Sequence, residues 1–324
     1  MARMSYLDAA RHGLAEEMRR DQGVWALGED LGRGGVFGQY RGLQEEFGPE
    51  RIADTPISEA AIMGAAVGAA MMGTRPVVEM RFSDFALCAM DELVNQAAKA
   101  RFMFGGQARV PMVVREPTGM WRSSAAQHSQ SLEAWYVHVP GLVVACPATP
   151  ADNKGLLKSA IRCDDPVVFM EHKSLWPMED EVPDDPDHLV PFGQARIARA
   201  GTDVTIATWS AQLHVCLDAA RTLDAAGVSA EVIDLRTLWP WDKAAVFASV
   251  ERTGRLLVAH EAVAVGGFGA EVVATVAERR GSALRVPPRR LGAPRALIGY
   301  APTVEDAMRV PAARVVRTVQ EMVG

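Results

Sequence analysis

Short β-rich runs alternate with longer helical patterns along most of this 324-residue chain. The expected strands are mostly β-branched or apolar and are bounded by Gly, Pro or Asp: residues 24–27, 76–80, 110–115, 142–146, 166–170, 204–207, 230–235 and 256–260. Helical patterns cover residues 5–20, 59–72, 84–102, 151–163, 211–226, 241–250 and 269–279. This alternation is typical of parallel sheets covered by helices and predicts an α/β fold.

The chain is long enough for two domains, at roughly 100–200 residues per domain. The stretch from Trp176 to Pro191 contains four prolines and six acidic residues, which is typical of an exposed linker. We therefore expect a first domain over residues 1–185, a linker over 186–200 and a second, smaller domain over 201–324. The sequence shows no tandem repeat, which excludes solenoids and propellers.

Composition excludes several classes of partner. A net charge of −6 gives no general attraction to phosphate backbones, so nucleic acid is not expected to bind. The four cysteines are scattered without a C-x-x-C pair, which indicates neither a zinc site nor a disulfide framework. The first residues lack the apolar core of a secretory signal, and no uncharged stretch suits a bilayer, so we expect a cytoplasmic protein without a membrane partner.

The segment Thr-Pro-Ile-Ser-Glu at 55–59 opens a helix of small residues. Ser58 is the predicted N-cap, and Glu59 lies in the first turn, where the helix dipole favours a carboxylate. From the residues alone, Glu59 is either a capping acid, the commoner case, or a catalytic one. Gly64 and Gly68 each cost about 1 kcal/mol relative to Ala inside a helix. The helix is therefore predicted to form a close-packing surface, within the domain or between subunits.

Two further segments bear on function. Gln-His-Ser-Gln-Ser at 127–131 follows a polar loop after an expected strand, where α/β proteins place ligands, and its His128 is either a surface histidine or a ligand-handling one. Gly-Gly-Phe-Gly at 266–269 opens a helix but lacks the G-x-G-x-x-G order, so a tight turn is favoured over a nucleotide site. P-loop, G-x-S-x-G and H-E-x-x-H motifs do not occur, which removes support for common nucleotide hydrolases, esterases and zinc proteases.

Eight segments, read in order along the chain, form one recognisable series. They are Leu-Gly-Glu-Asp (27–30), Asp-Thr-Pro-Ile-Ser-Glu (54–59), Gly-Ala-Ala-Val-Gly-Ala-Ala (64–70), Arg-Pro-Val-Val-Glu (75–79), Gln-His-Ser-Gln-Ser (127–131), Asp-Pro-Val-Val-Phe (165–169), Val-Ile-Asp-Leu-Arg-Thr-Leu (232–238) and Gly-Gly-Phe-Gly-Ala-Glu (266–271). With them the chain closely resembles, over nearly its whole length, the β subunit of thiamine-diphosphate-dependent 2-oxoacid dehydrogenases, a family that includes the pyruvate, branched-chain 2-oxoacid and acetoin enzymes.

The resemblance implies a pyrimidine-binding domain followed by a transketolase C-terminal-like domain, in an α2β2 heterotetramer with thiamine diphosphate between subunits. Glu59 matches the glutamate that hydrogen-bonds the aminopyrimidine ring and promotes the imino tautomer, and Phe85 matches an aromatic residue packed against that ring. His128 matches a histidine near the thiazolium, implicated in handling the substrate carboxylate and in acyl transfer to lipoamide. Glu29 and Asp91 match acids near the path between the two active sites.

The resemblance also concerns metal ions. A structural potassium ion is implied on the backbone carbonyls of Met112, Ala160, Ile161 and Cys163 and the side chain of Asp165, and carbonyl ligation tolerates the change to cysteine. Enzymes of this class anchor the diphosphate through magnesium on a Gly-Asp-Gly followed by Asn-Asn, and this chain has no such motif. We therefore expect an α subunit to hold the magnesium and the diphosphate, and the β chain alone to be inactive.

The chain departs from the family at Met120 and Trp121, which replace glycines before the histidine loop, and at Arg81, which adds a cation near the expected pocket. An unusual or acidic substrate would suit that cation. The leading expectation is a pyruvate or acetoin dehydrogenase β subunit, an oxidoreductase component that passes an acyl group to a lipoyl-bearing acyltransferase. The alternatives are a branched-chain 2-oxoacid dehydrogenase β subunit, a split transketolase-like carboligase without a lipoyl partner, or a catalytically silent scaffolding partner.

Overall fold

The computed structural model describes residues 1–324, which form two compact units. The first comprises Met1–Thr118 and Trp135–Phe192, and the second comprises Gly119–Ala134 and Gly193–Gly324. The units therefore differ from the boundaries expected from the sequence, because a loop inside the first half and residues 193–200 of the expected linker belong to the second unit. A composition shift marks a change of polarity along the chain and carries no information on which segments pack together.

Two segments that the sequence pattern assigned to the linker are strands. Strand β8 (Glu179–Val182) pairs antiparallel with β1 (Ala2–Ser5), and β9 (Arg196–Arg199) pairs antiparallel with β11 (Ala230–Asp234). Both are short and rich in charged residues, because they lie at edges or in a two-stranded sheet, where backbone hydrogen bonds stabilise a strand that has little apolar surface to bury.

The main sheet of the first unit is parallel, with the strand order β6, β7, β5, β4, β2, β3. Five of these strands were expected, and β3 was not, because its three residues include a polar one. The strands are β2 (Val24–Gly28), β3 (Ile52–Asp54), β4 (Arg75–Glu79), β5 (Val113–Thr118), β6 (Val143–Ala145) and β7 (Val167–His172). Their valine-rich runs are buried on both faces, as in other parallel sheets.

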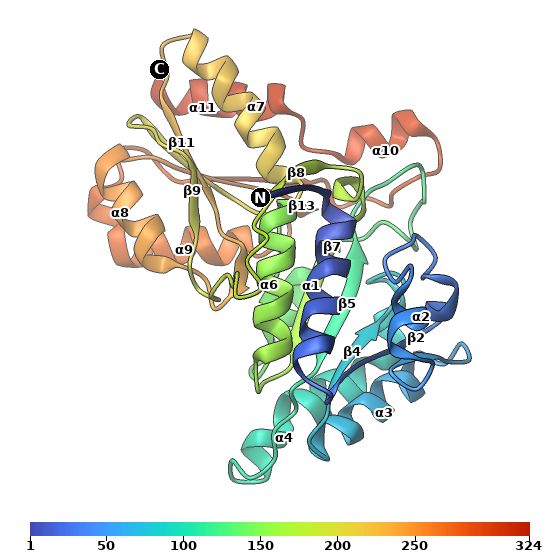
Figure 1. Ribbon diagram of the computed structural model, residues 1–324. Coiled ribbons are helices and arrows are strands. Elements are labelled where there is room, and N and C mark those ends of the chain that lie inside the picture. Colours follow the sequence, from blue (N-terminus) through green and yellow to red (C-terminus); the bar gives the residue numbers. More distant parts are fainter. The chain divides into compact units, whose positions relative to one another are not determined.

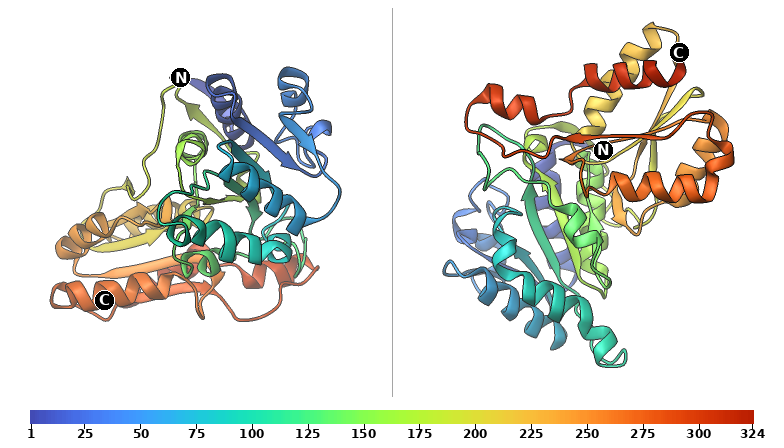
Figure 2. Two further views of the ribbon diagram at one scale, coloured as in Figure 1. Left: turned by 90° about the horizontal axis from the view of Figure 1, so that it is seen from below. Right: turned by 180° about the vertical axis from the view of Figure 1, so that it is seen from behind.

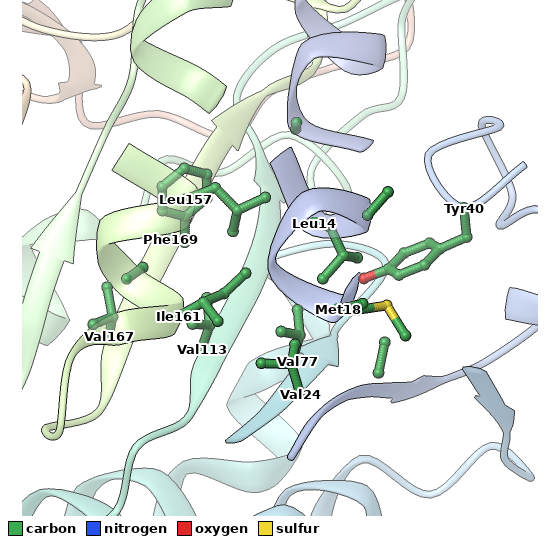
Figure 3. Packing of buried hydrophobic residues seen from close by; sticks show 14 of the residues in the cluster. Leu14, Met18, Val24, Tyr40, Val77, Val113, Leu157, Ile161, Val167 and Phe169 are labelled. Atoms are coloured by element: carbon green, nitrogen blue, oxygen red, sulfur yellow. The ribbon is translucent and has the colours of Figure 1, made fainter. Parts of the chain in front are cut away.

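Helices α1 (Tyr6–Arg20) and α6 (Pro150–Arg162) lie side by side on one face of this sheet (Figure 1). Both begin at capped positions, since Ser5 accepts a hydrogen bond from the Asp8 amide and Thr149 from the Asp152 amide. Figure 3 shows Leu14 and Leu157 of the two helices in the hydrophobic core against strand residues such as Val113.

Helix α3 (Glu59–Met71) packs against β4 and β2. The helix expected over 84–102 is divided into a 3₁₀ helix η2 (Phe85–Ala89), a π-helix η3 (Glu92–Ala97) and α4 (Ala98–Met103). Hydrophobic periodicity identified the helical run but did not distinguish these hydrogen-bonding patterns, and π-helical turns are frequent at functional sites. The first unit also contains η1 (Leu31–Arg33), α2 (Leu43–Phe47) and η4 (Lys173–Leu175), and α5 (Glu133–Val137) begins at the end of the 119–134 segment.

The second unit has a sheet with the strand order β14, β13, β10, β11, β9, in which every pair except β11–β9 is parallel. Helices α7 and α11 run side by side, and α8 and α9 lie on the other face of the sheet (Figure 2). The elements not yet given bounds are β10 (Val204–Thr208), α7 (Gln212–Ala225), β12 (Thr237–Trp239), α8 (Lys243–Thr253), β13 (Leu256–Val263), α9 (Gly269–Arg280), η5 (Gly281–Ala283), β14 (Arg289–Ala293), α10 (Pro302–Met308) and α11 (Ala312–Val323).

None of the helices combines the length and the hydropathy that crossing a lipid bilayer requires.

Candidate functional site

Glu59 is the first residue of α3 and is half-buried. Ser58 stands at the N-cap position as expected, but its side chain accepts no capping hydrogen bond. The Glu59 carboxylate itself has no hydrogen bond or ion pair with another residue of the chain. The local structure therefore leaves this carboxylate at the positive end of the helix dipole without a structural partner, which favours a ligand-binding role over a capping one.

Helix α3 packs against both η2 and η3, so the structure brings the elements that carry Phe85 and Asp91 to the helix of Glu59. The Phe85 ring packs edge-to-face on Phe82, with centroids 5.3 Å apart. Asp91 accepts a hydrogen bond of 2.6 Å from the Asn95 side-chain amide. An aromatic ring and carboxylates around one helix suit a flat, nitrogen-containing ring that needs both a stacking surface and a hydrogen-bond acceptor.

Glu29 lies at the end of β2, is buried, and accepts a hydrogen bond of 2.7 Å from Arg81. The same guanidinium lies 3.2 Å from the Asp30 carboxylate. Asp30 and Arg81 both have left-handed backbones, with φ of 59° and 53°, a strained conformation for residues other than glycine. Since two carboxylates face Arg81, its charge is already matched within the chain, and the idea of an acidic substrate loses its support.

A charged cluster that sequence patterns did not indicate joins the middle of β5 to the carboxyl ends of β4 and β7. Arg115 is buried and donates to both oxygens of Glu171, at 2.8 and 3.0 Å. Its guanidinium lies 3.9 Å from the Glu79 carboxylate, whose pKa burial raises to about 7. The signal available in the sequence was a charged residue inside each of three valine-rich strands, where a charge needs a partner.

The expected potassium ligands lie close together in the first unit, but several of their oxygens already have partners. The carbonyl oxygens of Ile161 and Cys163 accept hydrogen bonds of 3.0 and 2.9 Å from the Arg75 guanidinium. The Asp165 carboxylate lies 2.9 Å from Arg101. The carbonyls of Ala160 and Met112 accept hydrogen bonds from backbone amides. Arg75 thus places a positive charge of the chain itself at two of the expected ligands.

His128 belongs to the second unit, in a loop over residues 119–131 that follows β5. It is half-buried, and its amide donates to the Ala125 carbonyl. Met120 is 1% exposed and lines a pocket of about 100 Å³ together with Ser129, Leu132 and Glu261. The bulky side chain of Met120 is therefore packed inside the second unit. Trp121 remains half-buried.

The Gly-Gly-Phe-Gly segment has a packing explanation. A Cβ atom at Gly267 or Gly269 would lie within 2.8 or 2.6 Å of the His260 ring, and one at Gly292 would also lie within 2.8 Å of it. His260 is completely buried under these glycines. This close approach accounts for Gly267 and Gly269, and a left-handed backbone with a φ of 71° accounts for Gly266.

Comparisons with known proteins agree with this architecture. Residues 2–179 match the family described as "Transketolase, pyrimidine binding domain", and residues 193–315 match "Transketolase, C-terminal domain". A solved structure titled "Split gene transketolase, inactive beta4 tetramer" has the same fold, with a TM-score of 0.81, 23% identity, and coverage of 99% of this chain and 98% of that one.

Three curated relatives are similar along most of the chain. The "2-oxoisovalerate dehydrogenase subunit beta" of Bacillus subtilis is 43% identical, covering 99% of each chain. The "Acetoin:2,6-dichlorophenolindophenol oxidoreductase subunit beta" of Cupriavidus necator is 44% identical over 94% of this chain and 93% of its own. The "Pyruvate dehydrogenase E1 component subunit beta" of Rhizobium meliloti is 40% identical over 99% of this chain and 70% of its own.

The order of the two domains and the full-length similarity to these relatives together show that the chain belongs to the family of pyruvate, acetoin and branched-chain 2-oxoacid dehydrogenase β subunits, whose transketolase-type domains imply thiamine diphosphate as the cofactor.

Proposed function

We propose that this chain is the β subunit of a thiamine-diphosphate-dependent dehydrogenase complex that acts on pyruvate, acetoin or a branched-chain 2-oxoacid. In this proposal it works with an α subunit in an α2β2 heterotetramer in the cytoplasm, and the acyl group passes to a lipoyl-bearing acyltransferase. The observation that carries the proposal is the Glu59 carboxylate, half-buried at the start of α3 without a partner in the chain.

The residues of the first unit fit the pyrimidine half of the cofactor. Glu59 would share a proton with a ring nitrogen, and Phe85 would pack against the ring. When bound, thiamine diphosphate supplies the carbanion-stabilising centre that an amino-acid side chain cannot provide. The chain's own contribution is a carboxylate held in a partly dry position, where a hydrogen bond to the ring is stronger than in water. We assign the magnesium ion and the diphosphate contacts to the α subunit.

Helix α3 supports the proposal of a partner subunit. Ile57, which precedes its N-cap, and Met72, its C-cap, are 76% and 85% exposed. A Cβ atom added at Gly68 would meet nothing within 4 Å, and one at Gly64 would make only an ordinary contact with Glu92. Packing inside the chain therefore does not require these helix glycines. A second backbone that approaches α3 from outside the chain explains them and matches the α subunit that the family name implies.

The catalytic role of Glu59 is tested in the assembled α/β enzyme with Glu59→Gln, which keeps the size of the side chain and removes the carboxylate. We expect kcat to fall by roughly 100-fold or more, because general acid–base catalysis contributes on the order of 10²–10⁴. Turnover is measured with an artificial electron acceptor on pyruvate, acetoin and branched 2-oxoacids. The matched control is Glu271→Gln, which also removes a glutamate from the first turn of a helix, α9, and should keep wild-type turnover.

Wild-type turnover by the Glu59→Gln enzyme would overturn the assignment and favour the silent scaffolding role. Inactivity of the wild-type complex toward all three substrate classes would contradict the proposed substrates. Activity with an aldehyde acceptor but never with a lipoyl domain would instead favour the carboligase alternative.

His128 is proposed to act in acyl transfer to the lipoyl group. The variant His128→Ala is expected to slow acylation of a lipoyl domain about tenfold more than it slows turnover with an artificial acceptor. An exposed histidine outside the 119–131 loop, His138, provides the control variant His138→Ala. Equal rates of lipoyl acylation by His128→Ala and the wild type would contradict the role.

We also propose the potassium site, although Arg75 already donates to two of the carbonyl oxygens that would bind the ion. An ion on the Ile161 and Cys163 carbonyls would have to share them with the guanidinium through the second lone pair of each oxygen. Thermal unfolding in potassium and in sodium chloride of equal ionic strength tests this. A higher Tm in potassium supports the site, whereas equal Tm values mean that Arg75 is the only cation these carbonyls need.

A further inference from the structure

The loop over residues 119–131 has an unusual backbone. Gly119, Arg122, Ser123 and Ala125 all have left-handed φ angles, of 86°, 49°, 57° and 61°. Three of these residues carry side chains that disfavour this conformation, and such strain persists only where surrounding contacts determine the backbone. The contacts that hold this loop therefore matter for the position of everything on it, His128 included.

Two carboxylates from distant parts of the second unit accept hydrogen bonds from the loop's backbone. Glu261, in β13, accepts one of 2.7 Å from the Met120 amide. Glu305, in α10, accepts one of 2.8 Å from the Ser123 amide. Hydrogen bonds to an ionised carboxylate are roughly twice as strong as neutral ones. The two contacts fix the loop on both sides of its first left-handed side-chain residue, Arg122.

One guanidinium connects the two carboxylates to each other and to the loop. Arg309 donates to Glu305 at 2.5 Å and to the Met120 carbonyl at 3.1 Å, and it lies 3.6 Å from the second oxygen of Glu261. The side chains of Glu305 and Glu261 are only 6% and 12% exposed. The carboxylates of these ion pairs are therefore shielded from water, and the Arg309 side chain is 32% exposed, so the pairs are less solvated than surface pairs, which contribute little. The Asp306 carboxylate, which is exposed, lies 3.4 Å from Nε of Arg309.

We infer that Arg309, Glu305 and Glu261 are positioning residues, which hold the 119–131 loop in the shape that presents His128. The inference rests on the role of His128 in the proposed function. Arg309 lies against both carboxylates that accept from the loop amides, so its charge offsets the repulsion that would otherwise push them away from the loop. Arginine suits this task because its planar group of five N–H donors reaches several acceptors at once, which a lysine cannot do.

The test uses the reconstituted α/β holoenzyme and two readouts. The first is hydrogen exchange of the peptide that contains the Met120 and Ser123 amides, which reports the loop and does not depend on activity. In Arg309→Met we expect these amides to exchange about tenfold faster, since loss of a charged hydrogen-bond network is of this order. Arg309→Lys should restore protection only in part. Glu305→Gln should affect Ser123 more than Met120.

The second readout is kcat for acylation of a lipoyl domain, expected to fall about tenfold in Arg309→Met with KM for the 2-oxoacid or acetoin little changed. The matched control is Arg289→Met, which breaks a more exposed arginine–glutamate pair of the same unit, to Glu321. That variant should keep wild-type exchange in the loop and wild-type acylation.

Unchanged exchange in both Arg309→Met and Glu305→Gln would overturn the inference. Faster exchange with normal acylation in Arg309→Met, alongside impaired acylation in His128→Ala, would also overturn the positioning role. If exchange is faster but both variants acylate normally, the proposed role of His128 fails while the contacts of Arg309 with the loop stand.

Discussion

The imidazole of His260 stacks on the indole of Trp209, with ring centroids 5.1 Å apart and ring planes inclined by 17°. His260 Nδ1 lies 3.0 Å from the Ala262 carbonyl, which can only accept, so the hydrogen of the neutral ring is on Nδ1. Nε2 faces the glycines at the start of α9. Burial lowers the pKa of His260 to about 4, because a charged ring here would lose its hydration.

The first prediction follows from this pKa. Between pH 6.5 and 4 the unfolded chain binds a proton at His260 and the folded chain does not, so stability present above pH 6.5 is lost as the pH falls. From pH 7.5 to 5 this one site should account for about 2 kcal/mol of unfolding free energy. His260→Phe keeps a ring on Trp209 but cannot take up a proton. Measured by urea unfolding, the difference between its unfolding free energies at pH 7.5 and pH 5 should be smaller than that of the wild type by this amount. His138→Phe, at an exposed position, should match the wild type, and an unchanged slope in His260→Phe would refute the prediction.

Gly269 is predicted to be intolerant of alanine because of the same ring. A Cβ atom there would lie 2.6 Å from His260 Nε2, and crowding of a packed core typically costs about 1–3 kcal/mol. Gly281→Ala, where a Cβ meets nothing within 4 Å, should be nearly neutral. The double variant Gly269→Ala/His260→Ala should lose less unfolding free energy than the two single variants lose together, as measured by denaturant unfolding. Strict additivity would show that the two residues do not interact.

Arg115 is predicted to be essential for the stability of the first unit. Its removal in Arg115→Met leaves Glu171 and Glu79 buried without a cation, which should cost about 3–5 kcal/mol. Arg221→Met breaks an ion pair with Asp218 in which both side chains are more than half exposed, and should cost less than about 1 kcal/mol. Urea midpoints of the two variants compare the effects. Similar midpoints would mean that the buried cluster stabilises the first unit no more than an exposed ion pair does.

Substitutions at Gly68 should affect the stability of the chain and its association with the α subunit in opposite directions. Gly68→Ala should stabilise the isolated β chain by about 1 kcal/mol, since a Cβ atom has room and alanine is the better helix former. Gly68→Leu should leave the fold of the isolated chain intact but weaken association with the α subunit at least tenfold. Ala225→Leu, on the exposed end of α7, is the matched control for added bulk. Denaturant unfolding of the isolated β chain measures its stability, and analytical ultracentrifugation of α/β mixtures measures association. Association of Gly68→Leu as tight as that of the wild type would mean that the α subunit does not bind at this face of α3.

The sequence predicted those features that depend on neighbouring residues. Apolar runs such as residues 166–170 predicted a strand because such a run is buried wherever the sheet forms, and Glu59 was recognisable because its motif and its helix start are contiguous. The sequence pattern did not predict strands β8 and β9, because their stability comes from pairing with a strand elsewhere in the chain. Likewise, nothing near Arg75 in the sequence indicates that it donates to the Cys163 carbonyl.

The sequence by itself therefore determined the α/β class, the two-domain order and the family to which the chain belongs, since these follow from local patterns and their spacing. Only the tertiary structure decided what the glycines of 266–269 accommodate, and that Arg309 donates to the carbonyl of Met120, 189 residues earlier. The physical reason is range: strand and helix preferences act over a few residues, whereas steric fit and charge pairing act between any residues that folding brings into contact.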